Sequence, residues 1–284
     1  MLKPKKVRLT DRLINEGWFK SEKEALPWIM AGRVLVDTRR MISGAEMVST
    51  GGVIRVKEYY KTKYVNKGGL KLQWALENFD INVAGAVALD CGASTGGFTD
   101  CLLTRGAGMV YAVDAGFNML AGKLLADGRV VNMERTNISD GSLLSLTPKP
   151  ELVTLDLSYL SLKTGVAAAA GILRGKGEIV ALIKPIVEVR SPEIKRSGDV
   201  NRRGILTDVL TELCGFFEQD GYCVAGLTHS PVRGNNGALE YFIHLKIGDA
   251  TPGASNGLYR PPIERVIDES LKLAKFDKNN VREV

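Results

Sequence analysis

The sequence predicts an α/β fold, a mostly parallel and doubly wound sheet with a late antiparallel strand, preceded by a small α+β domain. From residue 86 onward, short apolar runs without polar alternation recur, with helical stretches between them, as in strands covered on both faces. Charge separates the first part: residues 1–57 hold 12 Lys/Arg against 6 Asp/Glu, whereas residues 58–284 hold 26 of each. An excess confined to one segment favours docking to a polyanion.

The first part, residues 8–57, predicts two short helices followed by a β-ribbon. Ser21 with Glu24 forms a capping box for the second helix, and Gly32 lies where a left-handed C-terminal cap is expected. Two alternating segments then predict strands at residues 33–37 and 53–57.

This order of elements resembles the S4 RNA-binding domain over about fifty residues. The resemblance implies an RNA-binding domain over residues 1–58 that presents cations from its helices and strands. Contacts of this kind hold phosphates without reading bases. The candidate RNA contacts are Arg12, Lys20, Lys23, Arg33, Arg39 and Arg40.

A basic linker is expected over residues 59–66. The lysines of this linker, together with Lys67 directly after it, are interleaved with tyrosines. Such a mixture suits phosphates and stacked bases. An interdomain hinge would also be polar and charged, so both interpretations fit. The candidate RNA contacts here are Lys61, Lys63 and Lys67.

The second domain, residues 67–248, is expected to carry the sheet. Strands are predicted at residues 86–90, 109–114, 129–137, 151–156 and 178–184, helices at 160–173 and 205–217, and a closing antiparallel pair at 222–230 and 239–247. Residues 249–284 are expected to form an extension with an amphipathic helix.

A glycine-rich loop, in the segment VALDCGASTGGF, follows the first predicted strand. Asp90 directly precedes this loop, and Ser94 stands where a dinucleotide motif has its second glycine. A carboxylate there suits a cationic, phosphate-free ligand better than a pyrophosphate. Asp114 ends the next strand, where an acid can accept hydrogen bonds from both ribose hydroxyls.

Together these residues resemble the S-adenosylmethionine site of class I (Rossmann-like) methyltransferases. The next strand should end near the adenine, where either Asn137 or Glu134 can contact the ring. The resemblance implies these cofactor contacts: Asp90, Gly92, Ser94, Gly96, Gly97, Phe98, Asp114, Asn137 and Asp156.

Topology brings four polar residues to one cleft, since ligands of open α/β sheets lie beyond the carboxyl ends of the parallel strands. Asp156 and Lys184 end two such strands. Glu240 begins the late antiparallel strand, whose amino end lies on the same edge. Lys71 lies in the helix that leads into the first strand.

The set Lys71, Asp156, Lys184 and Glu240 resembles the Lys-Asp-Lys-Glu tetrad of FtsJ-like RNA ribose 2′-O-methyltransferases. An S4 domain before it is the arrangement of the TlyA family, the haemolysin-like ribosomal-RNA methyltransferases. The resemblance implies S-adenosylmethionine-dependent 2′-O-methylation of a cytidine ribose in ribosomal RNA. The implied partner is this RNA, either free or in ribosomal subunits.

The chemistry of that reaction asks for a base and for alignment, and no metal is needed because the sulfonium methyl is already activated. Lys184 is the expected base, since burial and a second ammonium nearby favour the uncharged amine. Asp156 would orient Lys184, while Lys71 and Glu240 would hold the ribose.

Two other functions compete with this interpretation. The sequence Asp156-Leu157-Ser158-Tyr159 lies where amino methyltransferases carry an Asp-Pro-Pro-Tyr motif, which suggests N-methylation of an RNA base. Both prolines are absent, and such a motif explains neither lysine. A membrane-lytic haemolysin would need inserting segments, but the most apolar stretch, residues 165–173, predicts a buried helix.

Composition narrows the remaining options. The four cysteines show no C-x-x-C spacing and the chain has 2 histidines, so neither a zinc site nor a disulfide framework is expected. The N-terminus lacks an apolar signal region, and no apolar run approaches the ~18 residues of a membrane span. We therefore expect a cytoplasmic protein without a metal and without a membrane partner.

Overall fold

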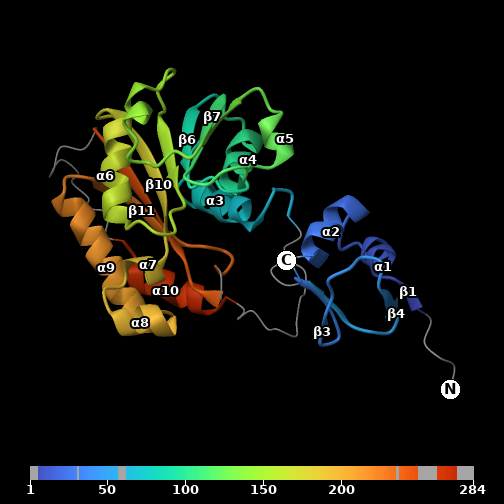
Figure 1. Cartoon of the computed structure of the whole chain (residues 1–284). Helices are drawn as coiled ribbons and strands as arrows, with labels where there is room; N and C mark the ends of the chain where they lie inside the picture. The colour runs from blue at the N-terminus through green and yellow to red at the C-terminus, as the bar shows by residue number, and fades with distance from the viewer. Residues whose placement is uncertain (1–5, 31, 57–61, 235–236, 249–260, 274–284) are drawn as a thin grey trace. The chain divides into compact units, whose positions relative to one another are not determined.

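The computed structural model describes residues 6–30, 32–56, 62–234, 237–248 and 261–273. The chain divides into two compact units, with the boundary between residues 61 and 62. Figure 1 shows both units, coloured from the N-terminus to the C-terminus.

The first unit is a small α+β domain with two small sheets, of order β1-β4 and β3-β2-β5. Its elements are β1 (Lys6–Arg8), α1 (Leu9–Asn15), α2 (Glu22–Met30), β2 (Val34–Val36), β3 (Arg39–Arg40), β4 (Met47–Ser49) and β5 (Ile54–Val56). Leu9, Ile29 and Val56 are among the side chains that form its core. The two predicted helices and the two predicted strands are confirmed, and β2 pairs antiparallel with β5.

Local signals account for both ends of α2. The hydroxyl of Ser21 accepts the backbone N–H of Glu24 at 3.3 Å, while the Glu24 carboxylate accepts the backbone N–H of Lys20 at 2.9 Å. Gly32, just after the helix, has a φ of +64°. The pairing of β1 with β4 has no such signal, because three-residue strands are too short to show alternation.

The second unit is built on a seven-stranded sheet of order β11-β12-β10-β9-β6-β7-β8. Its strands are β6 (Val87–Cys91), β7 (Met109–Asp114), β8 (Val130–Glu134), β9 (Leu152–Leu155), β10 (Gly177–Ile183), β11 (Cys223–His229) and β12 (Tyr241–Ile247). Neighbouring strands from β10 to β8 run parallel, while β12 runs antiparallel to β10 and β11. The predicted doubly wound sheet with a late antiparallel strand is confirmed.

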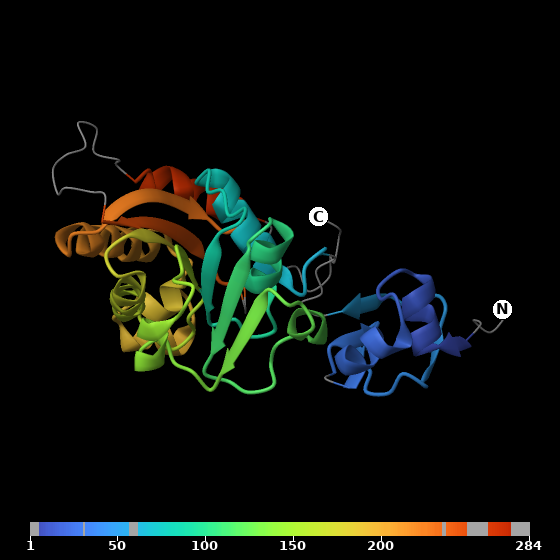
Figure 2. The ribbon, with the colours of Figure 1, turned by 90° about the horizontal axis from the view of Figure 1, so that it is seen from above.

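Helices cover both faces of this sheet (Figures 1 and 2). On one face lie α3 (Lys67–Asn78), α4 (Gly97–Thr104) and α5 (Gly122–Leu125), and on the other α6 (Leu162–Leu173) and α9 (Arg203–Gln219). Strand β10 serves both cores, because Ile179 and Ala181 face one and Val180 and Leu182 face the other. Shorter helical segments are η1 (Gly141–Ser145), α7 (Pro185–Glu188) and α8 (Pro192–Ser197).

Helix α10 (Ile263–Leu271) lies in the part of the chain that the sequence predicts to be an appended extension. The amphipathic helix is confirmed, and it packs against α9 and β11. Val266 and Ile267 are buried in the same core as α9. Across the described ranges, no helix is both long enough and apolar enough to cross a bilayer.

Candidate active site

One edge of the sheet gathers the four polar residues of the predicted cleft. Asp156 directly follows β9, Lys184 follows β10, and Glu240 precedes β12. Because Ile183 pairs with Tyr241, Lys184 and Glu240 are neighbours at the strand ends. The fourth residue reaches this edge from helix α3, since the ammonium of Lys71 contacts the Glu240 carboxylate. The structure therefore brings the predicted set together.

Lys71 and Glu240 form a buried ion pair, with side chains that are 6% and 7% exposed. Nζ of Lys71 donates to Oε2 of Glu240. A charge buried this deeply is tolerated only when it is paired, so each residue fixes the position of the other. Leu72 and Ala75, on the apolar side of α3, anchor the helix beneath the lysine.

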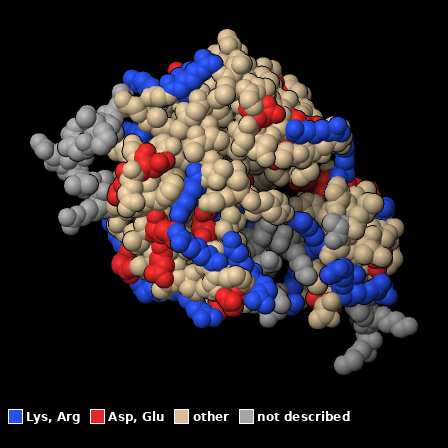
Figure 3. Space-filling view, turned by 60° about the vertical axis from the view of Figure 1, so that its left-hand side comes forward, with Lys and Arg blue, Asp and Glu red and all other residues tan. Residues whose placement is uncertain are grey.

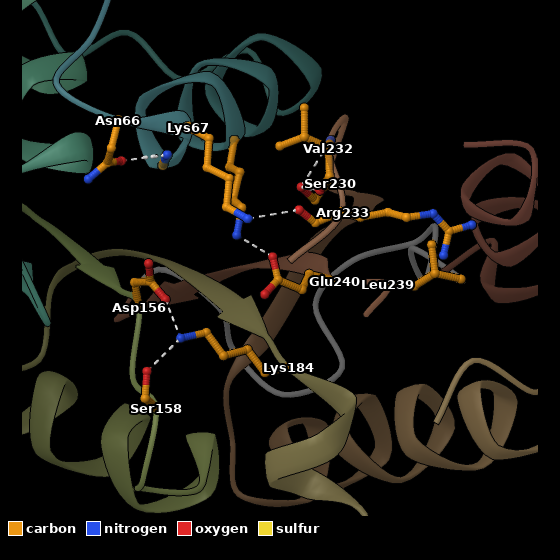
Figure 4. A network of polar contacts seen from close by, with 12 residues as sticks. Asn66, Lys67, Asp156, Ser158, Lys184, Ser230, Val232, Arg233, Leu239 and Glu240 are labelled. Atoms are coloured by element: carbon orange, nitrogen blue, oxygen red, sulfur yellow. Dashed lines mark hydrogen bonds and ion pairs between the residues drawn. The ribbon is translucent and has the colours of Figure 1, made fainter. Parts of the chain in front are cut away.

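Lys184 and Asp156 form a second, more open pair. Nζ of Lys184 lies 2.6 Å from Oδ1 of Asp156, and the two side chains are 16% and 26% exposed. The same nitrogen donates to the hydroxyl of Ser158 at 3.0 Å, as Figure 4 shows. Two oxygens thus hold one amine at the rim of the site, where a substrate hydroxyl can approach it.

The loop between β6 and α4 has a left-handed backbone at three positions. Gly92, Ser94 and Gly96 have φ values of +83°, +51° and +96°. A Cβ on Gly92 would come within 2.5 Å of the carbonyl oxygen of Asp156. The loop predicted to bind the cofactor therefore lies directly against the strand end that carries Asp156.

Asp114 closes this loop from the next strand. Its two carboxylate oxygens accept the backbone N–H groups of Ser94 and Gly116, each at 2.7 Å. Each oxygen keeps a lone pair that can accept a ribose hydroxyl. Phe117 and Met119 follow in the chain and are 61% and 45% exposed, so apolar surface suited to an adenine lies next to the acid. These residues fit an adenosyl group.

Asp90 and Phe98 lie differently from the expected ligand positions. Asp90 is 0% exposed, and its carboxylate accepts the hydroxyls of Thr99 at 2.7 Å and Thr154 at 3.0 Å. Burial raises the pKa of Asp90 to about 6, against hydrogen bonds that act to lower it. Phe98 is 3% exposed and packs against Phe242. Both side chains are therefore buried among their partners and are not exposed at the surface of the loop.

Two other predicted cofactor residues are Gly97 and Asn137. Gly97 begins α4 and lies so close to Asn66 that a Cβ would overlap the amide oxygen. Asn137 is exposed, and its side-chain oxygen accepts the backbone N–H of Ser139 at 3.1 Å. Its amide N–H₂ is the group that could donate to a ring nitrogen.

The structure also shows two residues that the sequence does not single out. Asn66 caps α3 by accepting the N–H of Gly68 at 2.6 Å, and its amide donates to the hydroxyl of Thr95 in the cofactor loop at 2.6 Å. An Asn before a helix is a recognisable cap signal. Phe117, whose ring lies 4.3 Å from the guanidinium carbon of Arg135, carries no sequence signal.

Arg12 differs from its expected role as a phosphate contact. It is 7% exposed, and its guanidinium binds Glu16 at 2.5 Å, the carbonyl of Gly52 at 2.6 Å and the carbonyl of Ser49. Glu16 directly follows α1, Ser49 ends β4, and Gly52 lies between β4 and β5. Arg12 therefore holds the first unit together and is not presented to a ligand.

The other predicted RNA contacts of the first unit are exposed: Lys20, Lys23, Arg33, Arg39 and Arg40. Arg39 pairs with Glu46 at 2.7 Å while its side chain stays 76% exposed. Lys61 lies outside the described residues. Lys63 is exposed over the ring of Tyr64, and Lys67 donates to the carbonyl of Arg233 at 3.3 Å, so the structure places Lys67 beside the active site.

Cations around α8 and α9 of the second unit are matched by acids. Figure 3 shows blue and red side chains mixed on the face that is turned forward there. Lys163 and Arg190 share Glu212 at 2.5 and 2.6 Å, and Arg202 pairs with Asp199 at 2.5 Å. This pairing agrees with the zero net charge of residues 58–284.

Comparisons with known proteins agree with this geometry. The FtsJ-like methyltransferase family model matches residues 64–247. YqxC of Bacillus subtilis (strain 168) is 36% identical over 281 residues, covering 98% of this chain and 99% of its own length. The 16S/23S rRNA (cytidine-2′-O)-methyltransferase TlyA of Mycobacterium tuberculosis (strain H37Rv) is 34% identical over 265 residues, covering 93% and 98%.

A solved structure supports the fold over both units. A protein from Streptococcus thermophilus, described as a hemolysin, is 34% identical and superimposes with a TM-score of 0.69 over 95% of this chain and 97% of its own. The family match covers the loop between β6 and α4 and all four residues predicted to be catalytic. The chain therefore belongs to the FtsJ-like methyltransferase family, with TlyA among its relatives, and is an enzyme that takes its methyl group from S-adenosylmethionine.

Proposed function

We propose that this enzyme methylates the 2′-hydroxyl of a cytidine ribose in ribosomal RNA. One observation carries the proposal: the open pair of Lys184 with Asp156 lies on the strand ends next to the buried pair of Lys71 with Glu240. A ribose hydroxyl needs a proton acceptor and a rigid seat, and these two pairs can supply both. The name of the relative TlyA, which specifies cytidine-2′-O methylation of 16S and 23S rRNA, supports this choice of substrate.

In this proposal Lys184 is the general base. S-adenosylmethionine, when bound, supplies a methyl group already activated by the sulfonium. Nζ of Lys184, in its uncharged form, would accept the proton that the ribose 2′-hydroxyl loses when its oxygen is methylated. Asp156 and Ser158 hold the amine in place through the contacts described above, and Asp156 stabilises the ammonium that forms.

Lys71 and Glu240 are proposed to seat the ribose. A buried carboxylate is a strong acceptor for a sugar hydroxyl, and the ammonium beside it is a donor for a sugar oxygen. Because both side chains are more than nine-tenths buried, they hold one geometry without a substrate. Alignment of this kind provides much of the rate acceleration in transfer reactions.

Residues 1–58 are proposed to be an S4-like RNA-binding domain, joined by the linker 59–66 to a methyltransferase domain. The exposed cations of the first unit support this proposal, in particular Lys23, Arg33 and Arg39. The excess positive charge of residues 1–57 would attract the phosphates of rRNA, while residues 67–248 perform the transfer. Helix α10 packs on this second domain, so the proposed catalytic domain extends through it.

Methylation mapping tests the proposal directly. Purified enzyme is incubated with labelled S-adenosylmethionine and with ribosomal subunits from cells that lack the gene, and the rRNA is then digested to nucleosides. We expect label in 2′-O-methylcytidine. Label in a base-methylated nucleoside would instead support the alternative based on Asp156-Leu157-Ser158-Tyr159. Lysis of lipid vesicles without any methyl transfer would support the membrane-lytic alternative.

A further inference from the structure

Helix α10 contacts the chain on both sides of Glu240. Ser270, on this helix, shares a hydrogen bond of 2.8 Å with the hydroxyl of Tyr241, which directly follows Glu240. Both partners are 0% exposed. Just beyond the helix, the carbonyl of Leu273 accepts a hydrogen bond of 2.9 Å from Arg233, in the loop that precedes Glu240.

Arg233 is a buried cation at the centre of that loop. It is 7% exposed, and its two terminal nitrogens donate to the carbonyls of Leu273 and Gly237, each at 2.9 Å. Its own carbonyl accepts from Lys67 at 3.3 Å, so the residue also touches the first turn of α3. A guanidinium presents its donors in a fixed fork, which sets the spacing between the groups that it binds.

Gly234, the next residue, lies directly against the Glu240 carboxylate. A Cβ at this position would overlap both carboxylate oxygens. The N–H of Gly234 donates to the carbonyl of Ala238 at 2.8 Å, which closes the loop on itself. The backbone that Arg233 fastens to α10 is therefore the same backbone that forms a wall for Glu240. A shift of this loop would move the carboxylate relative to Lys71.

We propose that Arg233 is a positioning residue that makes α10 part of the catalytic apparatus. By fastening the β11–β12 loop to the end of α10, it sets the Glu240 carboxylate against the ammonium of Lys71. The proposal rests on the proposed function of the Lys71–Glu240 pair. It assigns a role in catalysis to a helix that lies beyond residue 247, the end of the family match.

Three variants test the proposal on the full chain. Arg233→Gln removes the fork, and Gly234→Ala displaces the carboxylate without touching α10. We expect each to lower the single-turnover rate of methyl transfer about 10- to 100-fold, with the dissociation constant for S-adenosylmethionine changed less than about twofold. The matched control is Arg196→Gln, at an exposed arginine of α8 that contacts Pro192 and Glu193 on the protein surface. It should keep the wild-type rate.

A double-mutant cycle separates positioning from general loss of structure. If Arg233 acts through Glu240, then Arg233→Gln should lower the rate no further, within about twofold, when Glu240→Gln is already present. A residue that only stabilises the fold would add its effect in both backgrounds. Circular dichroism checks folding, and if Arg233→Gln does not fold, Arg233→Lys, which keeps the charge but loses the fork, decides the outcome.

These measurements distinguish failure of the proposed function from failure of the positioning role. If Glu240→Gln transfers methyl groups at the wild-type rate, the proposed function of the buried pair is wrong, and this inference falls with it. If Glu240→Gln is impaired while Arg233→Gln and Gly234→Ala keep the wild-type rate, the positioning role alone is overturned. Additive effects of Arg233→Gln and Glu240→Gln would also overturn it.

Discussion

The amine of Lys184 lies 2.6 Å from the carboxylate of Asp156, on the adjacent parallel strand, and this pair is more exposed than the pair of Lys71 with Glu240. This difference in exposure fits the roles proposed for the two pairs. A proton acceptor must be reachable by the substrate, whereas a seat for the ribose gains from rigidity. The sheet produces this difference because Lys184 and Asp156 end strands at the rim, while Lys71 is inserted from a helix.

Loss of either member of the open pair should abolish methyl transfer. Lys184→Ala removes the proposed base, and Asp156→Ala removes the group that orients it, so we expect the single-turnover rate to fall at least about 100-fold. Calorimetry should show S-adenosylmethionine still bound. Ser158→Ala is a milder change that serves as a control, because it removes one contact of the Lys184 amine and leaves the contact with Asp156. Near wild-type turnover by either alanine variant would rule out the assignment.

Asp90 should give the folding stability a distinctive pH dependence. Burial raises its pKa from the ordinary value of 3.8 to about 6 in the folded protein. Between these two pKa values the folded state still holds a proton that the unfolded state has released. The stability that Asp90 contributes is therefore fully present below pH ~4 and is lost as the pH rises through about 6. The difference in the free energy of unfolding between wild type and Asp90→Asn should change by about 3 kcal/mol across this window.

Urea unfolding at several pH values between 4 and 7.5 measures this difference. Other carboxylates titrate in both proteins, so the comparison cancels their contributions. Relative to the variant, the wild type should lose stability as the pH rises. Parallel stability curves for the two proteins would show that Asp90 ionises as an ordinary carboxyl.

Cofactor affinity should depend on Asp114 and Phe117. Asp114→Ala removes the proposed acceptor for the ribose hydroxyls, and Phe117→Ala removes exposed apolar surface beside it. We expect each to raise the dissociation constant for S-adenosylmethionine about tenfold, corresponding to ~1.4 kcal/mol. Phe117→Tyr should restore affinity, since it keeps the ring. Leu144→Ala, at an exposed apolar residue elsewhere in the same unit, should leave calorimetric affinity unchanged.

Cations of the first unit should divide into two classes. Arg39→Gln and Arg40→Gln should weaken rRNA binding, and each should reduce the slope of log affinity against log salt by about 1. Arg12→Gln should instead lower the melting temperature, because it leaves the carbonyls of Ser49 and Gly52 without their donor. Lys149→Gln, at an exposed lysine of the second unit, is the control for charge. An Arg12 variant of normal stability and weak RNA binding would contradict this division.

The sheet could be predicted from the sequence because its strands are apolar runs that need no partner to be recognised. The catalytic edge followed from topology, since the position of Asp156 and Lys184 after parallel strands fixes which end of the sheet they occupy. Asp90 shows the limit of this argument. It is itself part of β6, and only the packing of Thr99 and Thr154 shows that its carboxylate faces inward.

Contacts between distant segments could not be predicted. Nothing in the sequence around Arg12 indicates that its partners are carbonyls at Ser49 and Gly52, nearly forty residues away. The apolar face of α10 is visible in the sequence, but the surface that it covers is not. Its contacts through Ser270 and Leu273 depend on backbone positions that no local pattern encodes.

The reversed direction of β12 gives the two halves of the site unequal freedom to evolve. Lys184 and Asp156 directly follow central strands, so an inserted or deleted residue there would shift the sheet register. Glu240 comes instead at the end of the β11–β12 loop, where a change of length leaves the register of the parallel strands intact even though Arg233 and Gly234 of this loop are buried. Under the proposed roles, a change in this loop alters how Glu240 holds the ribose while Lys184 stays in place, so redesign of substrate preference would begin at this loop.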